Sequence, residues 1–423
     1  MELQPPRGTD DLLPPRSEQL LHLYERAHDV ARRFGFRYVE TPAFEHTELF
    51  ARTSGETSDV VTKEMYTFED KGGRSLTLRP EGTAPVVRAY LAHAHDLASP
   101  FRGYYVNTAY RHGRPQAGRL REFRIFGTEI LGTASAEADV EVIATADRFL
   151  RDRGLERTTL HLNSIGDETC RPAYREELVA YLEGFRDQLD EDCRNRLRAN
   201  PLRVFDCKVD GGKDFVRAAP MISDRLCAAC AAHFALVREG MAAAGVAFEL
   251  DPRLVRGLDY YTRTAFEFVS DALGGQQSTL CGGGRYDGLA ELLGGEPTPG
   301  VGFGLGLDRV LLAMAEEGIE PRASAGLTSY VVAVGDGSSE AARTLVRTLR
   351  DGGVPAAASL EERPLKAQLR AAERAGARFV GVIGPREAEA GSVSMRRLGD
   401  DASEEVALSD VVNWLLERDG DHG

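Results

Sequence analysis

Several features that mark other classes of protein are absent from this 423-residue chain. It has no run of about eighteen apolar residues, so we expect no membrane-spanning helix. The N-terminal stretch MELQPPRGTDDLLPP has no basic segment followed by an apolar core, so we also expect no signal peptide. These absences predict a protein without a membrane association, and the cytoplasm is its expected compartment.

An excess of positive charge is also missing. The formal net charge is −14, from 52 Lys and Arg against 66 Asp and Glu. This balance argues against indiscriminate binding of polyanions. It leaves open a nucleic-acid partner that binds through a local basic patch.

Cysteine is scarce, with six residues in a long chain, so a disulfide framework is not expected. Five of the six fall between Cys170 and Cys230. Cys227 and Cys230 form a CxxC pair followed by His233, and one interpretation is a structural zinc site. The other is a cysteine-bearing helix in a reducing compartment. Because a second CxxC is missing, we expect no bound metal and keep Cys227 and Cys230 as the zinc candidates.

Hydrophobic periodicity predicts helices and strands from the N-terminus onward. Apolar residues at helical spacing indicate a helix in RSEQLLHLYERAHDVARRFGF, which Gly35 ends. RYVETPAFE is typical of a strand closed by Pro42. In SLTLRPEGTAPVVRAYLAHA the period changes from 2 to 3.6, which predicts a strand, a turn and a helix with Pro85 in its first turn.

Two long strands, RGYYVNTAYR and EFRIFGTEILG, are joined by the loop HGRPQAGRLR, and strands joined in this way pair antiparallel. A helix at about 133–153 and the strand LHLNSIG follow. Residues from about 168 to 246 look helical and interrupt two β-rich blocks, so we interpret them as an inserted domain. Strands resume at 247, and VGFGLGLDRVLLAMAEEG passes from a Gly-rich strand into a helix.

A second domain is predicted after the linker PRASAGLT. Residues 328–423 alternate between strands and helices and predict a compact α/β domain with a mostly parallel sheet. The first domain then covers residues 1–325 and has a different character, because its motifs lie on antiparallel strands. It has neither GxGxxG nor a Walker lysine, so any ATP site there is not of the Rossmann or P-loop type.

The predicted hairpin is rich in arginine, with one acid, Glu122, between Phe101 and Arg124. Arginine forks onto phosphate oxygens and stays charged, so this loop suits a polyphosphate. A solvated charged hairpin is the alternative. The arginines are Arg102, Arg111, Arg114, Arg119, Arg121 and Arg124.

Strand alternation adds a buried acid to this hairpin. Phe123, Ile125, Gly127, Glu129 and Leu131 share one face. A glutamate on an apolar face needs a partner. That partner is either a ligand or one of the many arginines.

Four further segments combine glycine with one or two polar side chains at strand ends or turns. They are RPEGTA (Arg79 to Ala84), LVRGLDYY, LCGGGRYDGL and GVGFGLGLDR, which ends at Arg309. Glycine permits close backbone approach. Several such segments on separate strands predict one concave site for an anionic ligand.

In this order, these segments resemble the histidyl-tRNA synthetases, a family of class II aminoacyl-tRNA synthetases. RGTDDLLP, LTLRPEGTA, YRHGRPQAGRLREF, GTEILG, NPLRVFDCK, LVRGLDYYTRTAFEF, CGGGRYDGL, PGVGFGLGLDR and the C-terminal domain all match, so the resemblance runs essentially from end to end. It implies an α+β catalytic domain with an antiparallel sheet of six to seven strands, a helical insertion at about 168–246 that contacts the tRNA acceptor arm, and a C-terminal α/β anticodon-binding domain at 328–423. It also implies a homodimer built through the first helix and the strand ending at Pro42.

The reaction implied by the resemblance has two steps and uses ATP with Mg²⁺. The histidine carboxylate attacks the α-phosphate of ATP, which gives histidyl-adenylate and pyrophosphate. The acyl group then passes to the 3′-terminal adenosine of tRNA(His).

The resemblance also implies a role for individual residues in binding ATP. Arg111 and Arg256 would bind the α-phosphate and act as the catalytic residues, because both would stabilise charge that builds on phosphorus. Arg309 would bind the γ-phosphate, and Phe123 would stack on adenine. Gly257 would permit close approach beside Arg256.

Histidine-binding roles follow in the same way. Glu81 and Thr83 would hold the ammonium group of histidine. Glu129 and Tyr261 would pair with the two imidazole nitrogens, one of which donates and one of which accepts. Tyr286 would line the same pocket.

Two positions depart from the family pattern. Gly113 stands where the family usually has Glu near adenine, and Ile125 stands where it usually has Gln near the ammonium or carboxylate of the substrate. Strand alternation makes Ile125 face the site. A ligase paralogue with another amino acid or acceptor is therefore one alternative.

A catalytically impaired regulatory paralogue, like the regulatory subunit of ATP phosphoribosyltransferase, is the other alternative. Such proteins generally lack the anticodon domain. Residues 328–423 are present here, and so are Arg111, Arg256 and Arg309, which favours the ligase.

Overall fold

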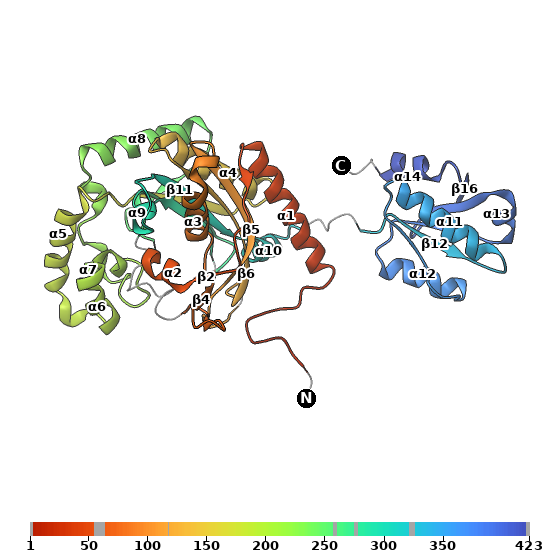
Figure 1. Cartoon of the computed structure of the whole chain (residues 1–423), viewed down its shortest axis with the longest axis horizontal. Coiled ribbons are helices and arrows are strands. Elements are labelled where there is room, and N and C mark those ends of the chain that lie inside the picture. Colours follow the sequence, from red (N-terminus) through yellow and green to blue (C-terminus); the bar gives the residue numbers. More distant parts are fainter. Residues whose placement is uncertain are drawn as a thin grey trace. The chain divides into compact units, whose positions relative to one another are not determined.

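The computed structural model describes residues 3–54, 64–116, 118–256, 260–274, 278–320 and 326–419. The chain divides into two compact units, Met1–Arg322 and Ala323–Gly423, each with its own sheet and helices (Figure 1). The first unit carries every segment that the sequence assigns to the pocket.

An eight-stranded sheet forms the centre of the first unit, in the order β1-β5-β6-β11-β10-β9-β7-β8. The six inner strands pair antiparallel, and only the short edge strands β1 and β8 pair parallel with their neighbours. The predicted antiparallel sheet is confirmed. It has eight strands, more than the six to seven expected, because of the two short edge strands β1 and β8. The strands are β1 (Arg37–Tyr38), β5 (Phe101–Tyr110), β6 (Glu122–Leu131), β7 (Thr158–Ser164), β8 (Glu249–Leu250), β9 (Thr262–Ser270), β10 (Thr279–Arg285) and β11 (Gly300–Gly306).

The two faces of this sheet bury different side chains. On one face, Phe126 and Ile130 of β6 pack with α1 (Arg16–Arg33), α4 (Ala136–Arg151) and α10 (Leu307–Glu316) in the largest apolar core. The opposite face carries Ile125 with a group of tyrosines, under α3 (Thr83–His93) and α9 (Leu289–Leu292). The alternation predicted for β6 is confirmed, and the second face is the one that holds the pocket.

The strand predicted to close at Pro42 is shorter than expected, because β1 ends at Tyr38. The segment gives β1 in the main sheet and then β2 (Phe44–His46), which joins a separate three-stranded sheet with β3 (Thr67–Glu69) and β4 (Ser75–Leu78). Proline has no N–H for a ladder and fixes its own φ, so the chain changes sheets there. Helix α2 (Thr47–Ser54) follows β2, and the short helix η2 (Ala94–Asp96) follows α3.

Residues between β7 and β8 form the helical insertion, which Figure 1 shows as a green layer at one end of the unit. It has a small core of its own, with Tyr174, Leu178 and Leu182 at its centre. Its last helix also returns to the main core, where Val237 and Met241 are fully buried. The elements are α5 (Arg171–Glu183), η3 (Arg186–Gln188), α6 (Glu191–Ala199), η4 (Pro201–Val204), α7 (Asp214–Arg217), η5 (Ile222–Asp224) and α8 (Ala228–Ala243).

The second unit contains a five-stranded sheet in the order β13-β12-β14-β15-β16. β12 pairs parallel with both neighbours, whereas β14–β15 and β15–β16 pair antiparallel, so the mostly parallel sheet predicted from the sequence is wrong. The antiparallel half arises because β15 and β16 follow one another without a long helical crossover. The elements are β12 (Ser329–Ala333), α11 (Ser338–Asp351), β13 (Ala356–Ala358), α12 (Leu365–Arg374), β14 (Phe379–Ile383), α13 (Pro385–Ala390), β15 (Ser392–Arg397), β16 (Glu404–Ala407) and α14 (Val411–Asp419).

Within the described ranges, no single helix is long and apolar enough to cross a membrane. One bent pair, Asp214–Asp224 with Ala228–Ala243, passes on length and composition alone, with a bend of 94° between its parts.

Candidate active site

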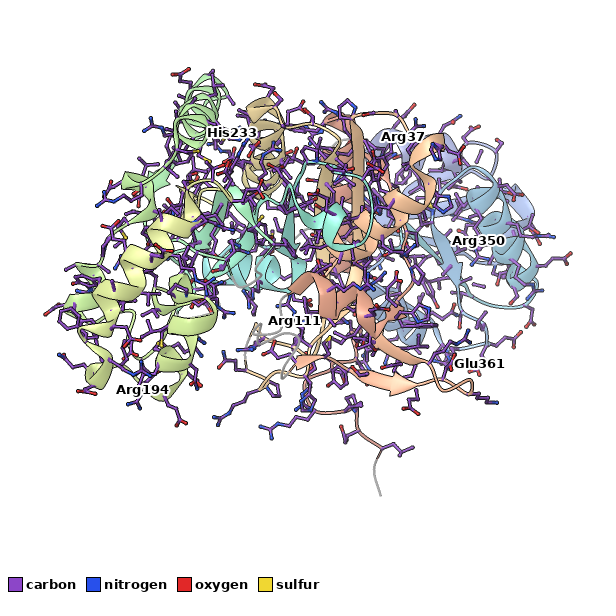
Figure 2. The ribbon with its side chains drawn as sticks, turned by 60° about the vertical axis from the view of Figure 1, so that its left-hand side comes forward. Arg37, Arg111, Arg194, His233, Arg350 and Glu361 are labelled. Atoms are coloured by element: carbon purple, nitrogen blue, oxygen red, sulfur yellow. The ribbon has the colours of Figure 1, made fainter. Side chains whose placement is uncertain are left out.

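A cavity of about 540 Å³ opens on the second face of the main sheet. Its floor contains glycines of β10 and β11, and its walls come from the β5–β6 hairpin, the start of α3 and the segment before β9. Its size suits a small-molecule ligand. Among the described residues, four arginines line it, namely Arg111, Arg119, Arg256 and Arg309, and Figure 2 labels Arg111 among the side chains of this unit.

Arg111 lies where the hairpin loop leaves β5. Its Nε donates to the carbonyl oxygen of Pro80 at 2.8 Å, and its guanidinium carbon lies 5.5 Å from the centre of the Phe123 ring. Phe123 also lines the cavity. The hairpin therefore presents a cation and an aromatic face side by side, which is an arrangement that suits a nucleotide.

Arg256 lies across the cavity from the hairpin and forms an ion pair with Glu267 of β9. Its guanidinium carbon is 5.6 Å from the centre of the Tyr261 ring. A Cβ on Gly282 would come within 2.3 Å of its Nη2, so glycine is needed on β10 for the arginine to lie there. Gly257 falls outside the described residues.

Arg309, at the start of α10, is held by two backbone carbonyls. Its Nε donates to Gly118 at 2.9 Å, and its Nη1 donates to Thr279 at 2.7 Å. These two bonds connect the hairpin loop to β10 and fix the guanidinium at the cavity wall. Arg111, Arg256 and Arg309 thus reach one cavity from three separate segments, as the sequence predicts.

Other arginines of the hairpin do not act as a group. Arg102 pairs with Glu141 at 2.5 Å, and Arg124 pairs with Asp308 at 3.2 Å, and neither arginine lines the cavity. Arg119 lines the cavity but forms an ion pair with Glu64. Part of the arginine run is therefore structural, because these residues join the hairpin to neighbouring helices and loops.

Glu81 and Thr83 line the cavity at the start of α3. The Glu81 carboxylate accepts the backbone N–H groups of Thr83 at 2.6 Å and of Ala84 at 2.9 Å, so it caps the helix. Burial raises the pKa of Glu81 above its usual range. The rigid cap keeps the carboxylate at the cavity wall, where an ammonium group could reach it.

Glu129 lies behind this wall rather than on it. It is fully buried and accepts hydrogen bonds from the hydroxyls of Thr83 at 2.7 Å, of Tyr105 at 3.1 Å and of Tyr286. Burial raises the pKa of Glu129 to about 8, and the bonds from Tyr286 and Thr83 oppose this shift. The cavity is lined by Thr83 and Tyr105, and Glu129 and Tyr286 form the layer beneath them.

Tyr105 is a member of this group that carries no motif in the sequence. Its ring fits into a space left by two glycines, because a Cβ on either Gly82 or Gly127 would come within 2.3 Å of it. The signal available in the sequence was strand alternation on β5 together with Gly127 on the strand that pairs with it. Tyr260 and Tyr261 close the cavity on the other side, with their ring centres 4.7 Å apart.

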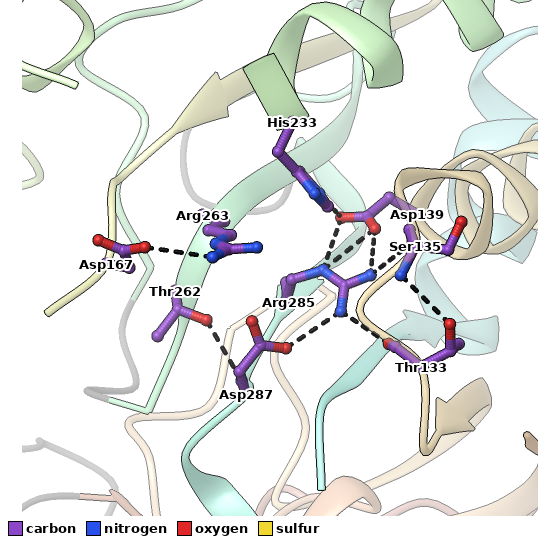
Figure 3. Close-up of polar contacts among 9 residues, drawn as sticks. All are labelled: Thr133, Ser135, Asp139, Asp167, His233, Thr262, Arg263, Arg285 and Asp287. Carbon is purple, nitrogen blue, oxygen red and sulfur yellow. Dashed lines mark hydrogen bonds and ion pairs between the residues drawn. The ribbon is translucent and has the colours of Figure 1, made fainter. Parts of the chain in front are cut away.

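A buried ion-pair network fixes the strand end that carries Tyr286 (Figure 3). Arg285 is fully buried and binds Asp139 of α4, with Nε to Oδ2 at 3.1 Å. It also donates to Asp287 at 3.0 Å and to the carbonyl oxygens of Thr133 and Ser135. Every face of the guanidinium is therefore bonded, and β10 is locked to α4.

His233 belongs to this network and not to the cysteines that precede it. Its Nε2 lies 3.4 Å from Asp139 Oδ1 (Figure 3), because α8 packs against α4 along this side. The CxxC-plus-histidine interpretation is therefore wrong for His233. Cys227 and Cys230 lie instead with Asp167 and Cys170.

Ile125 and Gly113, the two positions singled out by the resemblance, both line the cavity. Ile125 is 7% exposed and packs with the tyrosines of the second face. The strand alternation that turned it toward the site is confirmed. Its side chain gives the cavity an apolar surface at this position.

The antiparallel sheet and the arginine-lined cavity on one of its faces are those of a class II aminoacyl-tRNA synthetase. The sequence model of the histidyl-tRNA synthetase family matches residues 8–310, and that of the anticodon binding domain family matches residues 328–418. The chain therefore belongs to the histidyl-tRNA synthetase family.

Individual relatives cover almost the whole chain. A histidine–tRNA ligase from Moorella thermoacetica is 49% identical over 410 residues, which is 97% of each chain. One from Geobacillus kaustophilus is 45% identical over 423 residues and 99% of each chain. The crystal structure of the apo histidyl-tRNA synthetase of S. aureus is similar with a TM-score of 0.82 at 36% identity, over 98% of this chain and 100% of that one.

Proposed function

We propose that this protein activates histidine with ATP and transfers it to the 3′ end of tRNA(His). One observation carries the proposal for the pocket, namely that three fixed arginines surround a cavity whose wall is backed by a buried carboxyl group with three hydroxyl partners. The arginines suit a polyphosphate, and the buried polar layer suits a small polar side chain.

ATP enters this account as its magnesium complex. Arg111 and Arg256 stabilise the charge that builds on the α-phosphate as the histidine carboxylate attacks and pyrophosphate leaves. Arg309 binds the γ-phosphate, and Phe123 stacks on adenine. The bonds that hold these side chains before the ligand arrives support the assignment, because fixed cations need no reorganisation during the reaction.

Histidine occupies the end of the cavity near α3. Glu81 and Thr83 hold its ammonium group, and Tyr261 and the layer of Glu129 and Tyr286 recognise its imidazole. Imidazole offers one donor and one acceptor, which a carboxylate and a phenol can satisfy together. Glu129 is one layer deeper than the cavity wall, so its contact with the ring requires Thr83 or Tyr105 to shift, and otherwise it acts by orienting their hydroxyls.

The remaining assignments concern partners. Half-exposed apolar side chains on α1 and the first strands, including Leu21, Tyr38 and Phe44, support a homodimer built through these elements. The second unit, which matches the anticodon binding domain, binds the anticodon of tRNA, and the insertion contacts the acceptor arm. We place the protein in the cytoplasm.

Aminoacylation of total tRNA tests the proposal. The full chain with ATP, Mg²⁺ and labelled histidine should charge a tRNA fraction that hybridises to a tRNA(His) probe. A regulatory paralogue would charge nothing, and a paralogue with another acceptor would form the adenylate but leave tRNA(His) uncharged. Either result would overturn the proposal.

A further inference from the structure

Two clusters of thiols and carboxylates lie in the insertion, apart from the active site. The first cluster contains Asp167, Cys170, Cys227 and Cys230, and the second cluster contains Asp190, Cys193, Cys207 and Asp210. Within each cluster, one ligand atom from every residue lies within 4.8 Å of all the others. Together they use five of the six cysteines of the chain.

Both clusters repeat the same spacing. Asp167 and Cys170 are separated by two residues, as are Cys227 and Cys230, and the second cluster repeats this with Asp190–Cys193 and Cys207–Asp210. Two pairs with this spacing, brought together from distant segments, are the arrangement of structural zinc sites. A search for two cysteines at this spacing finds only the Cys227–Cys230 pair. In the other three pairs, an aspartate takes the place of one cysteine.

The distances agree with four ligands around one ion. Zinc binds sulfur at ~2.3 Å and carboxylate oxygen at ~2.1 Å, so tetrahedral ligands are about 3.5 to 3.8 Å apart. In the first cluster, Cys170 Sγ lies 3.9 Å from Cys230 Sγ and 3.6 Å from Asp167 Oδ1. In the second cluster, Cys207 Sγ lies 3.5 Å from Asp190 Oδ2. The sulfur–sulfur separation is far too long for a disulfide.

The backbone around each pair turns toward the ligand atoms. In the first cluster, the N–H of Asp167 points to Cys170 Sγ at 3.4 Å, and the N–H of Cys230 points to Cys227 Sγ at 3.5 Å. In the second cluster, the N–H of Cys193 donates to Asp190 Oδ1 at 2.6 Å. Such outer bonds orient ligands and stabilise their anionic forms.

A cationic side chain lies beside each cluster. Four anionic ligands around one divalent ion leave an excess of negative charge, which such a cation offsets. Asp167 turns Oδ1 to the cysteines and receives Arg263 Nη2 on Oδ2 at 3.3 Å, which Figure 3 shows. Asp210, which is fully buried, pairs with Lys213 at 2.6 Å.

We propose that each cluster binds one Zn²⁺ ion, so that the insertion holds two structural zinc sites, of the types Cys₃Asp and Cys₂Asp₂. The alternative is that the thiols and carboxylates are held together only by hydrogen bonds. That alternative would account for each individual contact. It would not explain why both clusters have the same spacing and four ligand atoms that all lie within 4.8 Å of one another.

The first site fixes the point where the insertion leaves the catalytic sheet. Cys170 is the N-cap of α5 and Cys227 is the N-cap of α8, so one ion joins the first and last helices of the insertion. Arg171, the next residue, donates to the carbonyl oxygen of Tyr261 at 2.7 Å. The site is therefore positioned to hold a wall of the cavity in place.

The second site stabilises the interior of the insertion. Asp190 caps α6, and Cys207 and Asp210 lie in the turn after η4. Asp206, directly before Cys207, lines the cavity. Loss of this ion should therefore loosen a segment that reaches the pocket mouth.

Metal content of the full chain tests the proposal without reference to activity. Protein purified from zinc-supplemented cells and dialysed against metal-free buffer should hold about two zinc atoms per chain by plasma mass spectrometry. Cys227→Ser and Cys207→Ser should each lower this to about one, and Cys281→Ser, the cysteine outside both clusters, should leave it unchanged. Asp167→Cys should keep the full content, because thiolate replaces carboxylate as a ligand.

Cobalt gives a second measurement that needs no variant. Chelator-treated wild-type protein titrated with Co²⁺ should show the visible bands of tetrahedral cobalt and a thiolate charge-transfer band, saturating at about two equivalents. Absence of both retained zinc and tetrahedral cobalt bands in folded protein would overturn the proposal. Iron in place of zinc, or zinc that survives both serine substitutions, would overturn it as well.

Activity provides a dependent readout, which rests on the proposed function. If the first site holds Tyr261, Cys227→Ser should raise KM for histidine more than KM for ATP. Failure of this prediction alone, with two zinc atoms present, would remove the link to the pocket and leave the metal sites intact.

Discussion

Gly302 lies directly against the carboxylate of Glu129. β11 pairs with β6 so that these two residues are opposite one another, and a Cβ on Gly302 would come within 1.7 Å of Oε2. The glycine therefore creates the space in which a buried carboxylate and its hydroxyl partners fit. The absence of a side chain at Gly302 on β11 is therefore what allows the Glu129 carboxylate to lie on β6.

Gly302→Ala should displace Glu129 and lower both stability and histidine use. Overpacking of this kind costs about 1 to 3 kcal/mol. Thermal melting and histidine-dependent ATP–pyrophosphate exchange measure the two effects. Gly304→Ala is the matched control for melting, because a Cβ there meets nothing within 4 Å. Equal melting temperatures for the two variants would contradict the packing argument.

Glu129→Gln should change how stability depends on pH. The pKa of Glu129 is raised from 4.5 to about 8 in the folded protein, so between these values the folded state holds a proton that the unfolded state has lost. Wild-type stability should therefore fall with rising pH across this window, by up to about 1.4 kcal/mol per pH unit, and Gln removes this dependence.

The measurement for Glu129 is the difference in melting temperature between Glu129→Gln and wild type. It should move in favour of the variant from pH 5 to pH 8. A difference that is constant over this range would show that Glu129 is ionised throughout, held by its hydroxyl partners more strongly than burial opposes it.

Arg256→Ala should lower kcat for ATP–pyrophosphate exchange by about 10²-fold or more, since a fixed cation on the reacting phosphate is lost. Arg102→Ala is the control, because Arg102 forms an ion pair with Glu141 and does not line the cavity. Steady-state exchange with saturating histidine separates the two. Full kcat in Arg256→Ala would remove the residue from the α-phosphate.

Asp139→Ala should be strongly destabilising, by about 3 to 5 kcal/mol, because Arg285 would remain buried without its partner. Asp29→Ala, which breaks an exposed i,i+4 pair with Arg33, should cost about 0.5 kcal/mol or less. Urea unfolding compares the two. A similar small loss in both would mean that the carbonyl oxygens around Arg285 suffice.

The same aspartate predicts an acid limit to stability. Burial opposes ionisation of Asp139, but His233 and Arg285 hold its pKa below the usual range in the folded protein. The stability from this group is therefore present above the unfolded pKa and is lost as the pH falls toward the lower folded value. Asp139→Asn should be less sensitive to acid than wild type in urea unfolding at pH 5 and below.

Local patterns were sufficient for much of the fold and for part of the pocket. Strand alternation predicted that Ile125 faces the site, and the order of the motifs predicted that Arg111, Arg256 and Arg309 share one site. All four residues line the cavity. Alternation gives the side of a strand but not the depth at which a residue lies, so it could not place Glu129 behind the wall. Depth depends on glycines of other strands, such as Gly302.

Partners that come from distant segments were also beyond local reasoning. Glu267 pairs with Arg256 only because β9 returns beside it, and His233 meets Asp139 only because α8 packs on α4. Of the two clusters of thiols and carboxylates, the sequence pointed only to Cys227 and Cys230, because the spacing was sought in cysteine alone. In the second unit, β16 (Glu404–Ala407) is short and mostly exposed, so hydrophobic periodicity gives no signal for it.

ATP–pyrophosphate exchange with each standard amino acid in turn, for wild type and Glu129→Ala, tests the central claim most directly. The account predicts exchange with histidine well above that with any other amino acid, and its loss in Glu129→Ala while KM for ATP changes little. Exchange driven best by another amino acid, or by none, would contradict it.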